Sequence, residues 1–97
     1  MDEKTVERRL VDGVKKLGGM CLKFVSPSTP GVPDRLLIIP PGRILFVELK
    51  TETGRLSKIQ RYVVGEMRKR GADVRVVKGR DEVDALLAEL AGGGDSQ

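Results

Sequence analysis

The stretch "GVPDRLLIIPPGRILFVELK", residues 31–50, contains two apolar segments on either side of the tripeptide Pro-Pro-Gly. Apolar segments of this composition, separated by turn residues, are typical of a β-hairpin. If the tripeptide is a three-residue turn, Gly42 takes the left-handed backbone conformation that such turns often require. The two strands are then antiparallel and in register, so that Ile39 faces Arg43.

The same register places charged residues at the open end of the hairpin. Asp34, which begins the first strand, faces Glu48 near the end of the second. Side chains directly across an antiparallel pair share one face of the sheet, with Cβ atoms about 4.5–5.5 Å apart. Lys50 lies two residues beyond Glu48 and therefore shares that face. A β-bulge in either strand would shift this register by one residue.

The rest of the chain alternates between helical and extended patterns. Apolar residues at helical spacing predict helices over residues 3–17, 57–70 and 81–91, with Ile59, Val63 and Met67 as the apolar stripe of the second. Residues 20–26 and 73–78 are rich in strand formers, whereas 27–33 and 51–55 have loop composition.

The central strands are apolar on both faces, which is typical of a sheet covered on both sides. We therefore expect one α/β domain over residues 1–91, with a mixed β-sheet flanked by helices, in three layers or nearly so. Its elements follow the order α-β-β-β-α-β-α. Residues 92–97, "GGGDSQ", are expected to form a flexible tail.

Composition excludes several kinds of site. The chain has 97 residues and no histidine, which excludes Ser-His and Cys-His catalysis and histidine-ligated zinc. A single cysteine, Cys21, excludes an intramolecular disulfide, and its context in "MCLKFV" favours a small buried strand residue over a nucleophile. Only three aromatic residues argue against a single-strand-binding surface built on base stacking.

Charge and hydropathy limit the partners. The net charge of +4 is compatible with a polyanion, although clustered basic residues are also expected on solvated helix faces. No apolar run approaches the roughly 20 residues that a spanning helix needs, so no membrane partner is expected. One cysteine and no apolar leader fit a reducing, intracellular setting.

Two facing carboxylates repel each other unless a cation lies between them. Magnesium fits, because it is a hard cation that takes carboxylate oxygens and keeps several waters. A bound metal lowers the pKa of a water and stabilises charge on a phosphoryl oxygen, and Lys50 could orient or deprotonate the attacking water. Asp34, Glu48 and Lys50 together therefore indicate phosphodiester hydrolysis. A surface ion pair of Lys50 with either acid explains the same three residues without any chemistry.

The opening stretch, preceded by "GGMCLKFVSPS" and followed by "LSKIQ", resembles the VRR-NUC family of the PD-(D/E)XK nuclease superfamily. The superfamily motif is a Pro-Asp, a variable strand-turn-strand and then Glu-x-Lys. It matches Pro33-Asp34 and Glu48-Leu49-Lys50 in this sequence. The resemblance runs from about Glu3 to Val77, without departure at the core positions, and implies a restriction-endonuclease-like fold.

The resemblance also implies roles for these residues. Asp34 and Glu48 would bind a divalent metal, Mg²⁺ or Mn²⁺, with help from the backbone carbonyl of Leu49. Lys50 would act on the attacking water.

Two helical residues would complete the catalytic set. The acid of the family's first helix matches Glu7, which would complete the metal shell directly or through water, and Glu3 is its rival one turn earlier. Glu7 could instead be only an exposed helix acid. The glutamine that the family carries after Glu-x-Lys matches Gln60, which is also three residues after Ser57, the spacing of a capping box. Both roles of Gln60 can hold at once.

Basic residues near the expected site are candidates for DNA binding. They are Lys23, Arg55 and Lys58, together with the loop 26–33, because phosphate contacts position a substrate without reading its sequence. Lys23 could instead be an ordinary surface lysine. Arg35 points to the opposite face from Asp34 by strand parity, which favours a structural role.

The function expected from these observations is a divalent-metal-dependent DNA endonuclease, selective for branched or junction DNA, that acts in replication, repair or recombination. Family likeness and small size further imply a homodimer in the cytoplasm of a bacterial or phage-infected cell. One alternative is a catalytically silent DNA-binding or assembly module with the same fold. Another is a small structural or partner-binding α/β domain.

Overall fold

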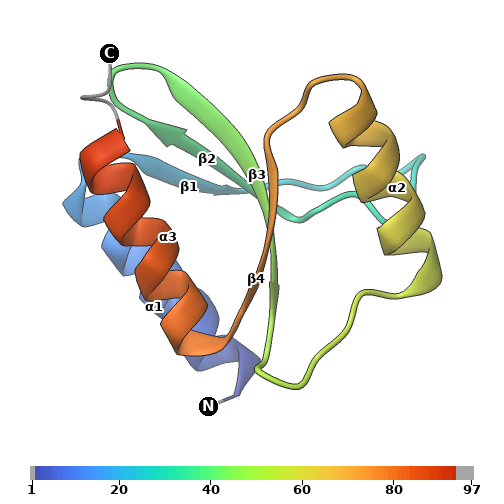
Figure 1. Ribbon diagram of the computed structural model, residues 1–97, viewed down its shortest axis with the longest axis horizontal. Helices are drawn as coiled ribbons and strands as arrows, with labels where there is room; N and C mark the ends of the chain where they lie inside the picture. Colours follow the sequence, from blue (N-terminus) through green and yellow to red (C-terminus); the bar gives the residue numbers. More distant parts are fainter. Residues whose placement is uncertain (1, 94–97) are drawn as a thin grey trace.

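A computed structural model describes residues 2–93. The chain forms, in order, α1 (Glu3–Lys16), β1 (Met20–Lys23), β2 (Arg35–Ile39), β3 (Arg43–Lys50), α2 (Lys58–Lys69), β4 (Val74–Lys78) and α3 (Gly79–Gly93). The sheet order is β1-β2-β3-β4, with two antiparallel pairings followed by the parallel pairing of β3 with β4. Helices α1 and α3 lie on one side of the sheet and α2 on the other (Figure 1). The expected α/β architecture, mixed sheet and element order are confirmed.

The hairpin of β2 and β3 has the predicted register. Ile39 pairs with Arg43, and the ladder continues without a bulge as far as Arg35, which pairs with Val47. In the turn, the N–H of Gly42 donates to the carbonyl of Ile39 at 2.9 Å. Gly42 has a φ of 141°, which a residue with a Cβ rarely adopts. The tripeptide therefore closes the hairpin as the sequence predicts.

The main core lies between the sheet and the pair of helices α1 and α3. Alternate residues of the strands face this side, because successive side chains of a strand point to opposite faces. The buried residues of this core are Val6, Leu10, Val14, Leu37, Ile39, Leu45, Val47, Leu49, Val77, Val83, Leu86 and Leu90. Cys21 lies on β1 as predicted and packs against the same cluster, but it is partly buried and not fully buried.

The second face of the sheet is covered at only one end. Helix α2 buries Val63 and Val64 there, whereas Ile59, predicted as part of the apolar stripe, is 46% exposed. At the hairpin end of this face Met20 and Ile44 are more than half exposed. The apolar character of β3 on both faces therefore predicted a third layer, but α2 is too short to cover the whole sheet.

Three element boundaries differ from the sequence prediction by more than one residue. Strand β1 ends at Lys23 instead of residue 26, because the proline-rich loop leads the chain away and leaves Val25 exposed. Helix α3 begins at Gly79 and continues to Gly93, so it includes two glycines that the sequence assigned to the tail. The remaining tail residues, 94–97, lie outside the described residues. In the described part of the chain, no helix combines the length and apolar character that crossing a bilayer requires.

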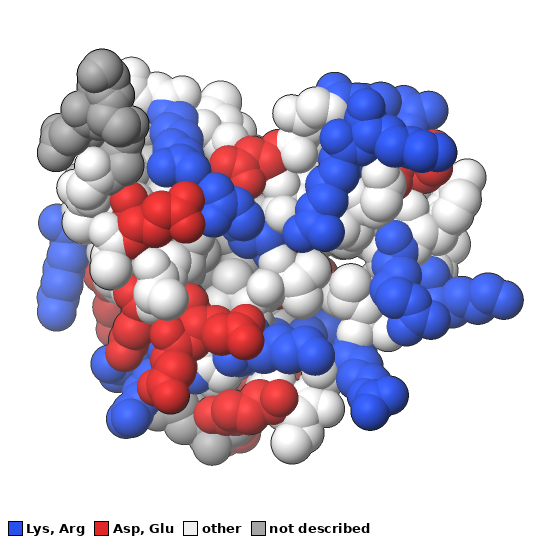
Figure 2. All heavy atoms as spheres, viewed as in Figure 1, with Lys and Arg blue, Asp and Glu red and all other residues white. Residues whose placement is uncertain are grey.

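Charges are distributed unevenly over the helices. In the view of Figure 2, acidic side chains gather over α3 and basic side chains over α2. Part of the acidic group is tied to the sheet: Glu89 of α3 accepts hydrogen bonds from Arg75 of β4 at 2.9 Å and from Arg43 of β3 at 3.0 Å. Arg75 also donates to Asp73 at 2.6 Å. This four-residue network fastens the end of α3 to β3 and β4.

The network predicts a pH-dependent contribution to stability. Arg75, and Arg43 after it, lower the pKa of Glu89 from its usual range to about 2. A carboxylate with a lowered pKa stabilises the fold fully above its unfolded pKa of about 4.3, and this contribution is lost as the pH falls through about 2. Because Glu89 is 46% exposed, we expect Glu89→Gln to lower the unfolding free energy by no more than about 1 kcal/mol at pH 7.

The measurement is urea denaturation of wild type and Glu89→Gln at pH 7, 4 and 3. The difference between them should shrink toward pH 3. Asp12→Asn, which removes an exposed carboxylate of α1 outside the network, is the control for a general charge effect. A difference that stays constant over this pH range contradicts the assignment.

Candidate active site

Glu48 is the centre of the candidate site. It is 8% exposed. Among the described residues, it is the one charged residue that is buried. Its neighbours Val47 and Leu49 face the main core, so strand alternation turns Glu48 toward the α2 side of the sheet. Lys50 Nζ lies 3.5 Å from Glu48 Oε2, and Gln60 Nε2 donates to the same oxygen at 3.3 Å. Glu48, Lys50 and Gln60, which the sequence predicted as site residues, are therefore in contact.

The environment of Glu48 disfavours a lone negative charge. Burial raises the pKa of Glu48, and the charge of Asp34 raises it further, while Lys50 opposes both effects. A carboxylate in such surroundings is readily stabilised by an additional cation. Buried acids with shifted pKa values and a specific charged neighbour are common at functional sites.

Asp34 lies one residue before the first pair of the β2–β3 ladder. Its carbonyl accepts a hydrogen bond from the N–H of Phe24 at 2.8 Å, which extends the pairing with β1 by one step. Its side chain is half-exposed, and its charge acts on Glu48. The two acids are therefore neighbours, as the hairpin register predicted, with Asp34 at the open edge and Glu48 inside.

Glu7 reaches the same end of the sheet from α1, but its carboxylate is paired with cations. Arg35 donates to Glu7 Oε2 from Nη2 at 2.6 Å and from Nε at 3.1 Å, and Lys23 Nζ lies 3.5 Å away. Arg35 holds the pKa of Glu7 below its usual range. Its rival Glu3 is exposed in the first turn of α1. The structural role expected for Arg35 is therefore identified: it joins β2 to α1 through Glu7.

The described residues contain no group of three or more acids or cysteines placed to hold a metal ion. The acids here form a pair, Asp34 and Glu48, with Glu7 linked to Asp34 through Lys23, whose Nζ is 4.0 Å from Asp34 Oδ2. A magnesium ion needs only one or two protein carboxylates, because it keeps several of its waters. The pair fits such an ion, while the assignment of Glu7 to the metal shell stays a prediction.

Gln60 forms the predicted cap and also contacts Glu48, while its catalytic role stays a prediction. Its side-chain oxygen accepts a hydrogen bond from the N–H of Ser57 at 2.9 Å, and its own N–H donates to Ser57 Oγ at 3.1 Å. This reciprocal pair is a capping box, which fixes the first turn of α2. The amide nitrogen remains free to contact Glu48. The cap thus positions the donor that touches the buried acid.

The three candidate DNA-binding residues occupy different places. Lys23 is 60% exposed and lies between Glu7 and Asp34. Arg55 and Lys58 are both exposed, the first in the loop before α2 and the second at the start of that helix. None of these positions tests the assignment to DNA binding, but all three leave charge accessible at the α2 side or the open end of the sheet.

Lys78 is a neighbour of the site that the sequence analysis missed. It pairs with Lys50 in the parallel ladder of β3 and β4, so its side chain shares the face of Lys50. A signal existed: "RILFVELK" and "DVRVVK" both end in lysine, and a strand that follows a crossover helix is often parallel to the strand before it. Pairing of these strands was not inferred, so the second lysine was overlooked.

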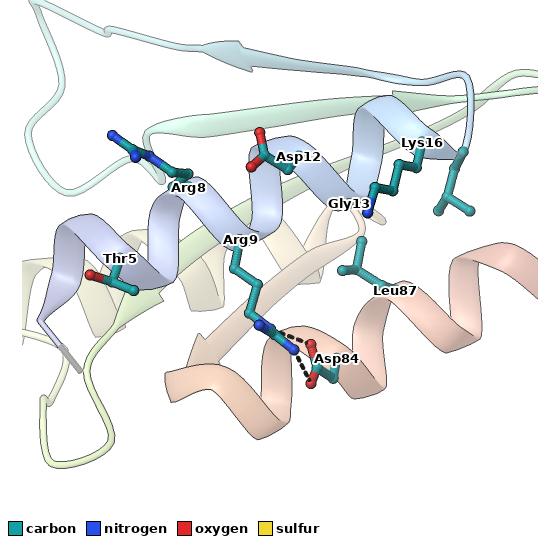
Figure 3. Close-up of a pocket in the computed structure, with 9 residues that line it drawn as sticks. Thr5, Arg8, Arg9, Asp12, Gly13, Lys16, Asp84 and Leu87 are labelled. Atoms are coloured by element: carbon teal, nitrogen blue, oxygen red, sulfur yellow. Dashed lines mark hydrogen bonds and ion pairs between the residues drawn. The ribbon is translucent and has the colours of Figure 1, made fainter.

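A groove with a volume of about 550 Å³ lies elsewhere, on the outer side of α1 and α3. Arg9 of α1 spans it and donates to Asp84 of α3 at 2.7 and 3.0 Å, and Leu87 packs against Gly13 (Figure 3). These helices are separated from Glu48 by the sheet. The groove is therefore a seam between two packed helices and not part of the candidate site.

Comparison with known proteins places the geometry in a family. The VRR-NUC domain profile matches residues 3–81, which is most of the chain. The chain belongs to the VRR-NUC domain family. A solved structure described as a VRR_NUC domain is 35% identical, with a TM-score of 0.84, and the match covers 91% of this chain and 96% of that one.

A curated protein named "Putative nuclease p44", from Acyrthosiphon pisum secondary endosymbiont phage 1, is 54% identical over 48 residues. The match covers 50% of this chain, which spans about half the length of that relative. These comparisons confirm the family and the α/β fold that the sequence predicted.

The pair of Glu7 and Arg35 generates a prediction for this site. Because both side chains are partly buried and share two hydrogen bonds, we expect a coupling free energy of about 1 kcal/mol. A double-mutant cycle of Glu7→Ala and Arg35→Ala, read by urea denaturation, measures it. The matched cycle uses Glu3→Ala with Arg35→Ala and should give a coupling near zero. Equal coupling in the two cycles would show that Glu7 has no specific partner in Arg35.

Proposed function

We propose that this VRR-NUC domain is a divalent-metal-dependent DNA endonuclease. The observation that carries the proposal is the buried Glu48, which has Asp34 as a charged neighbour and Lys50 3.5 Å away. Membership of the VRR-NUC family and the name of the phage relative support nuclease chemistry. The metal, the endonucleolytic mode and the kind of DNA are parts of the proposal.

Asp34 and Glu48 supply the donors that Mg²⁺ or Mn²⁺ prefers, and the main-chain carbonyl of Leu49 lies between Glu48 and Lys50 in the chain. When bound, the metal would lower the pKa of a water and offset charge on the phosphate. It would also relieve the unfavourable burial of Glu48, because a nearby cation favours the charged form of a carboxylate.

The side chains around Glu48 would position the water, the phosphate and Glu48 itself. Lys50, 20% exposed on the same face, is positioned to hold the attacking water or the phosphate oxygen that becomes more negative in the transition state. Gln60 orients Glu48 through the contact at 3.3 Å. Lys23 at the outer edge is available for a phosphate next to the one that is cut.

The decisive test is cleavage of labelled branched and linear DNA with Mg²⁺, with Mn²⁺ and with EDTA. We expect cleavage only with metal, and a loss of at least about 100-fold in Glu48→Ala and Lys50→Ala, because each removes a group at the reacting centre. Glu3→Ala is the matched control and should cleave like wild type if Glu7 is the helical acid.

Two results contradict the proposal. One is cleavage by Glu48→Ala or Lys50→Ala at the wild-type rate. The other is DNA binding without metal-dependent cleavage by wild type, which would identify a silent DNA-binding module.

We also propose that the substrate is branched or junction DNA and that the active form is a homodimer inside a bacterial or phage-infected cell. A domain of 97 residues buries a modest core, and Met20 and Ile44 leave apolar surface at the hairpin end. A two-fold dimer would hold two sites at a fixed spacing, which suits paired cuts across a junction.

Light scattering tests the dimer. We expect a mass of about twice the 10.6 kDa chain at micromolar concentration. A monomer at that concentration contradicts the proposed dimer. It does not affect the proposed cleavage chemistry, which the cleavage assay tests separately.

A further inference from the structure

The segment around α2 carries the basic excess of the chain. Residues 55–70 contain one acid, Glu66, and six basic residues, whereas α3 contains four acids and one base, Arg80. The six are Arg55, Lys58, Arg61, Arg68, Lys69 and Arg70. Figure 2 shows the same separation, with basic side chains over α2 and acidic ones over α3. The α2 side is therefore the electropositive side of the molecule in this view.

Four residues of α2 form a stripe on its outer face. Lys58, Arg61, Tyr62 and Gly65 follow the spacing i, i+3, i+4 and i+7, which places them on one side of a helix. All four are exposed, and the buried residues Val63 and Val64 lie on the other side. We call these four residues the α2 stripe.

The two cations of the stripe differ from those at the end of the helix. Lys69 and Arg70 both pair with Glu66, at 3.3 and 2.9 Å. Among the described residues no carboxylate lies within ion-pair distance of Lys58 or Arg61, and Arg61 donates only to the carbonyl of Leu56, at 3.1 Å. The stripe therefore presents positive charge that no acid of residues 2–93 neutralises.

Tyr62 adds an aromatic ring to the same face of the helix as these cations. It is 64% exposed, whereas the two phenylalanines pack edge to face on each other with centroids 5.7 Å apart. An exposed aromatic ring beside Lys and Arg is the combination with which proteins hold an unpaired base and its phosphates. One ring does not make the stacking platform of a single-strand-binding protein, but it is enough for one base.

Nothing in residues 2–93 explains a glycine at position 65. It lies in the interior of α2, where glycine is less favourable than alanine, and a Cβ at this position would meet no atom within 4 Å. A glycine that packing does not require leaves the helix backbone open to close approach by a ligand. Its position within the stripe is consistent with a strand of nucleic acid that runs against the helix.

The α2 stripe lies on the same helix as Gln60, which contacts the candidate active site. Gln60, on the inner side of the same helix, contacts Glu48 and takes part in the capping box with Ser57. A ligand bound along the outer face of α2 is thus held by the helix that positions a donor against the buried acid.

We propose that the α2 stripe binds DNA at a branch point, with Lys58 and Arg61 on phosphates and Tyr62 stacked on an unpaired base. The proposal rests on the proposed nuclease function and names the surface that would select branched over fully paired DNA. It concerns binding, so it can be tested apart from cleavage.

The test is fluorescence anisotropy in EDTA with two DNAs of equal length, a fork with unpaired arms and a full duplex. Lys58→Ala with Arg61→Ala should bind both DNAs at least about 10-fold more weakly and reduce the slope of log K against log salt by about 2, one for each lost phosphate contact. Lys69→Ala with Arg70→Ala removes the same charge from the far end of α2 and should change binding by less than about 3-fold.

Single substitutions separate the ring and the glycine from the charges. Tyr62→Ala should weaken binding of the fork at least about 5-fold and leave the duplex unchanged, while Tyr62→Phe keeps the affinity of wild type. Gly65→Ala should raise Tm, because alanine favours the helix, and yet weaken binding of both DNAs.

The proposal is overturned if the two double variants lose the same affinity, or if Tyr62→Ala affects neither DNA or both equally. If wild type binds and cleaves DNA and the stripe variants bind it normally, the proposed role of the α2 stripe is wrong but the proposed nuclease function stands. Wild type that binds neither DNA rejects the proposed function together with it.

Discussion

The register of the β2–β3 hairpin is the constraint on which the site depends. Because the turn fixes Ile39 against Arg43, every later pair is fixed as well, and a slip of one residue would turn Glu48 into the main core. The apolar middle of the hairpin resists such a slip, since Leu37 and Leu45 would then leave the core. The same packing that stabilises the sheet therefore determines which side of it holds the acid.

The sequence was sufficient for the features that local rules control. The three-residue turn, the pairing of the central strands, the order of elements and the capping box of α2 follow from turn chemistry, strand parity and helix-end spacing. Side chains on one hairpin are close in sequence, so the neighbourhood of Asp34, Glu48 and Lys50 was accessible to the same reasoning. These features depend on residues that are close together in the chain.

Features that depend on long-range packing were not accessible. The sequence placed Glu7 on a helix that borders the sheet, but its pairing with Arg35 depends on the way α1 crosses β2. The position of Lys78 beside Lys50 requires the parallel pairing of β4, and the exposure of Ile59 depends on how α2 is rotated against the sheet. These contacts join residues far apart in the sequence, where periodicity carries no information.

The separation of acidic α3 from basic α2 has a consequence for the encounter with DNA. Opposite charges on two sides of a small protein form a permanent electric dipole, and a polyanion exerts a torque on such a dipole before the surfaces touch. The acidic surface of α3 would be turned away, so α2 and the neighbouring Glu48 would meet the DNA first. Diffusion would then search fewer orientations, and dissolved salt, which shortens the reach of the field, would lengthen that search.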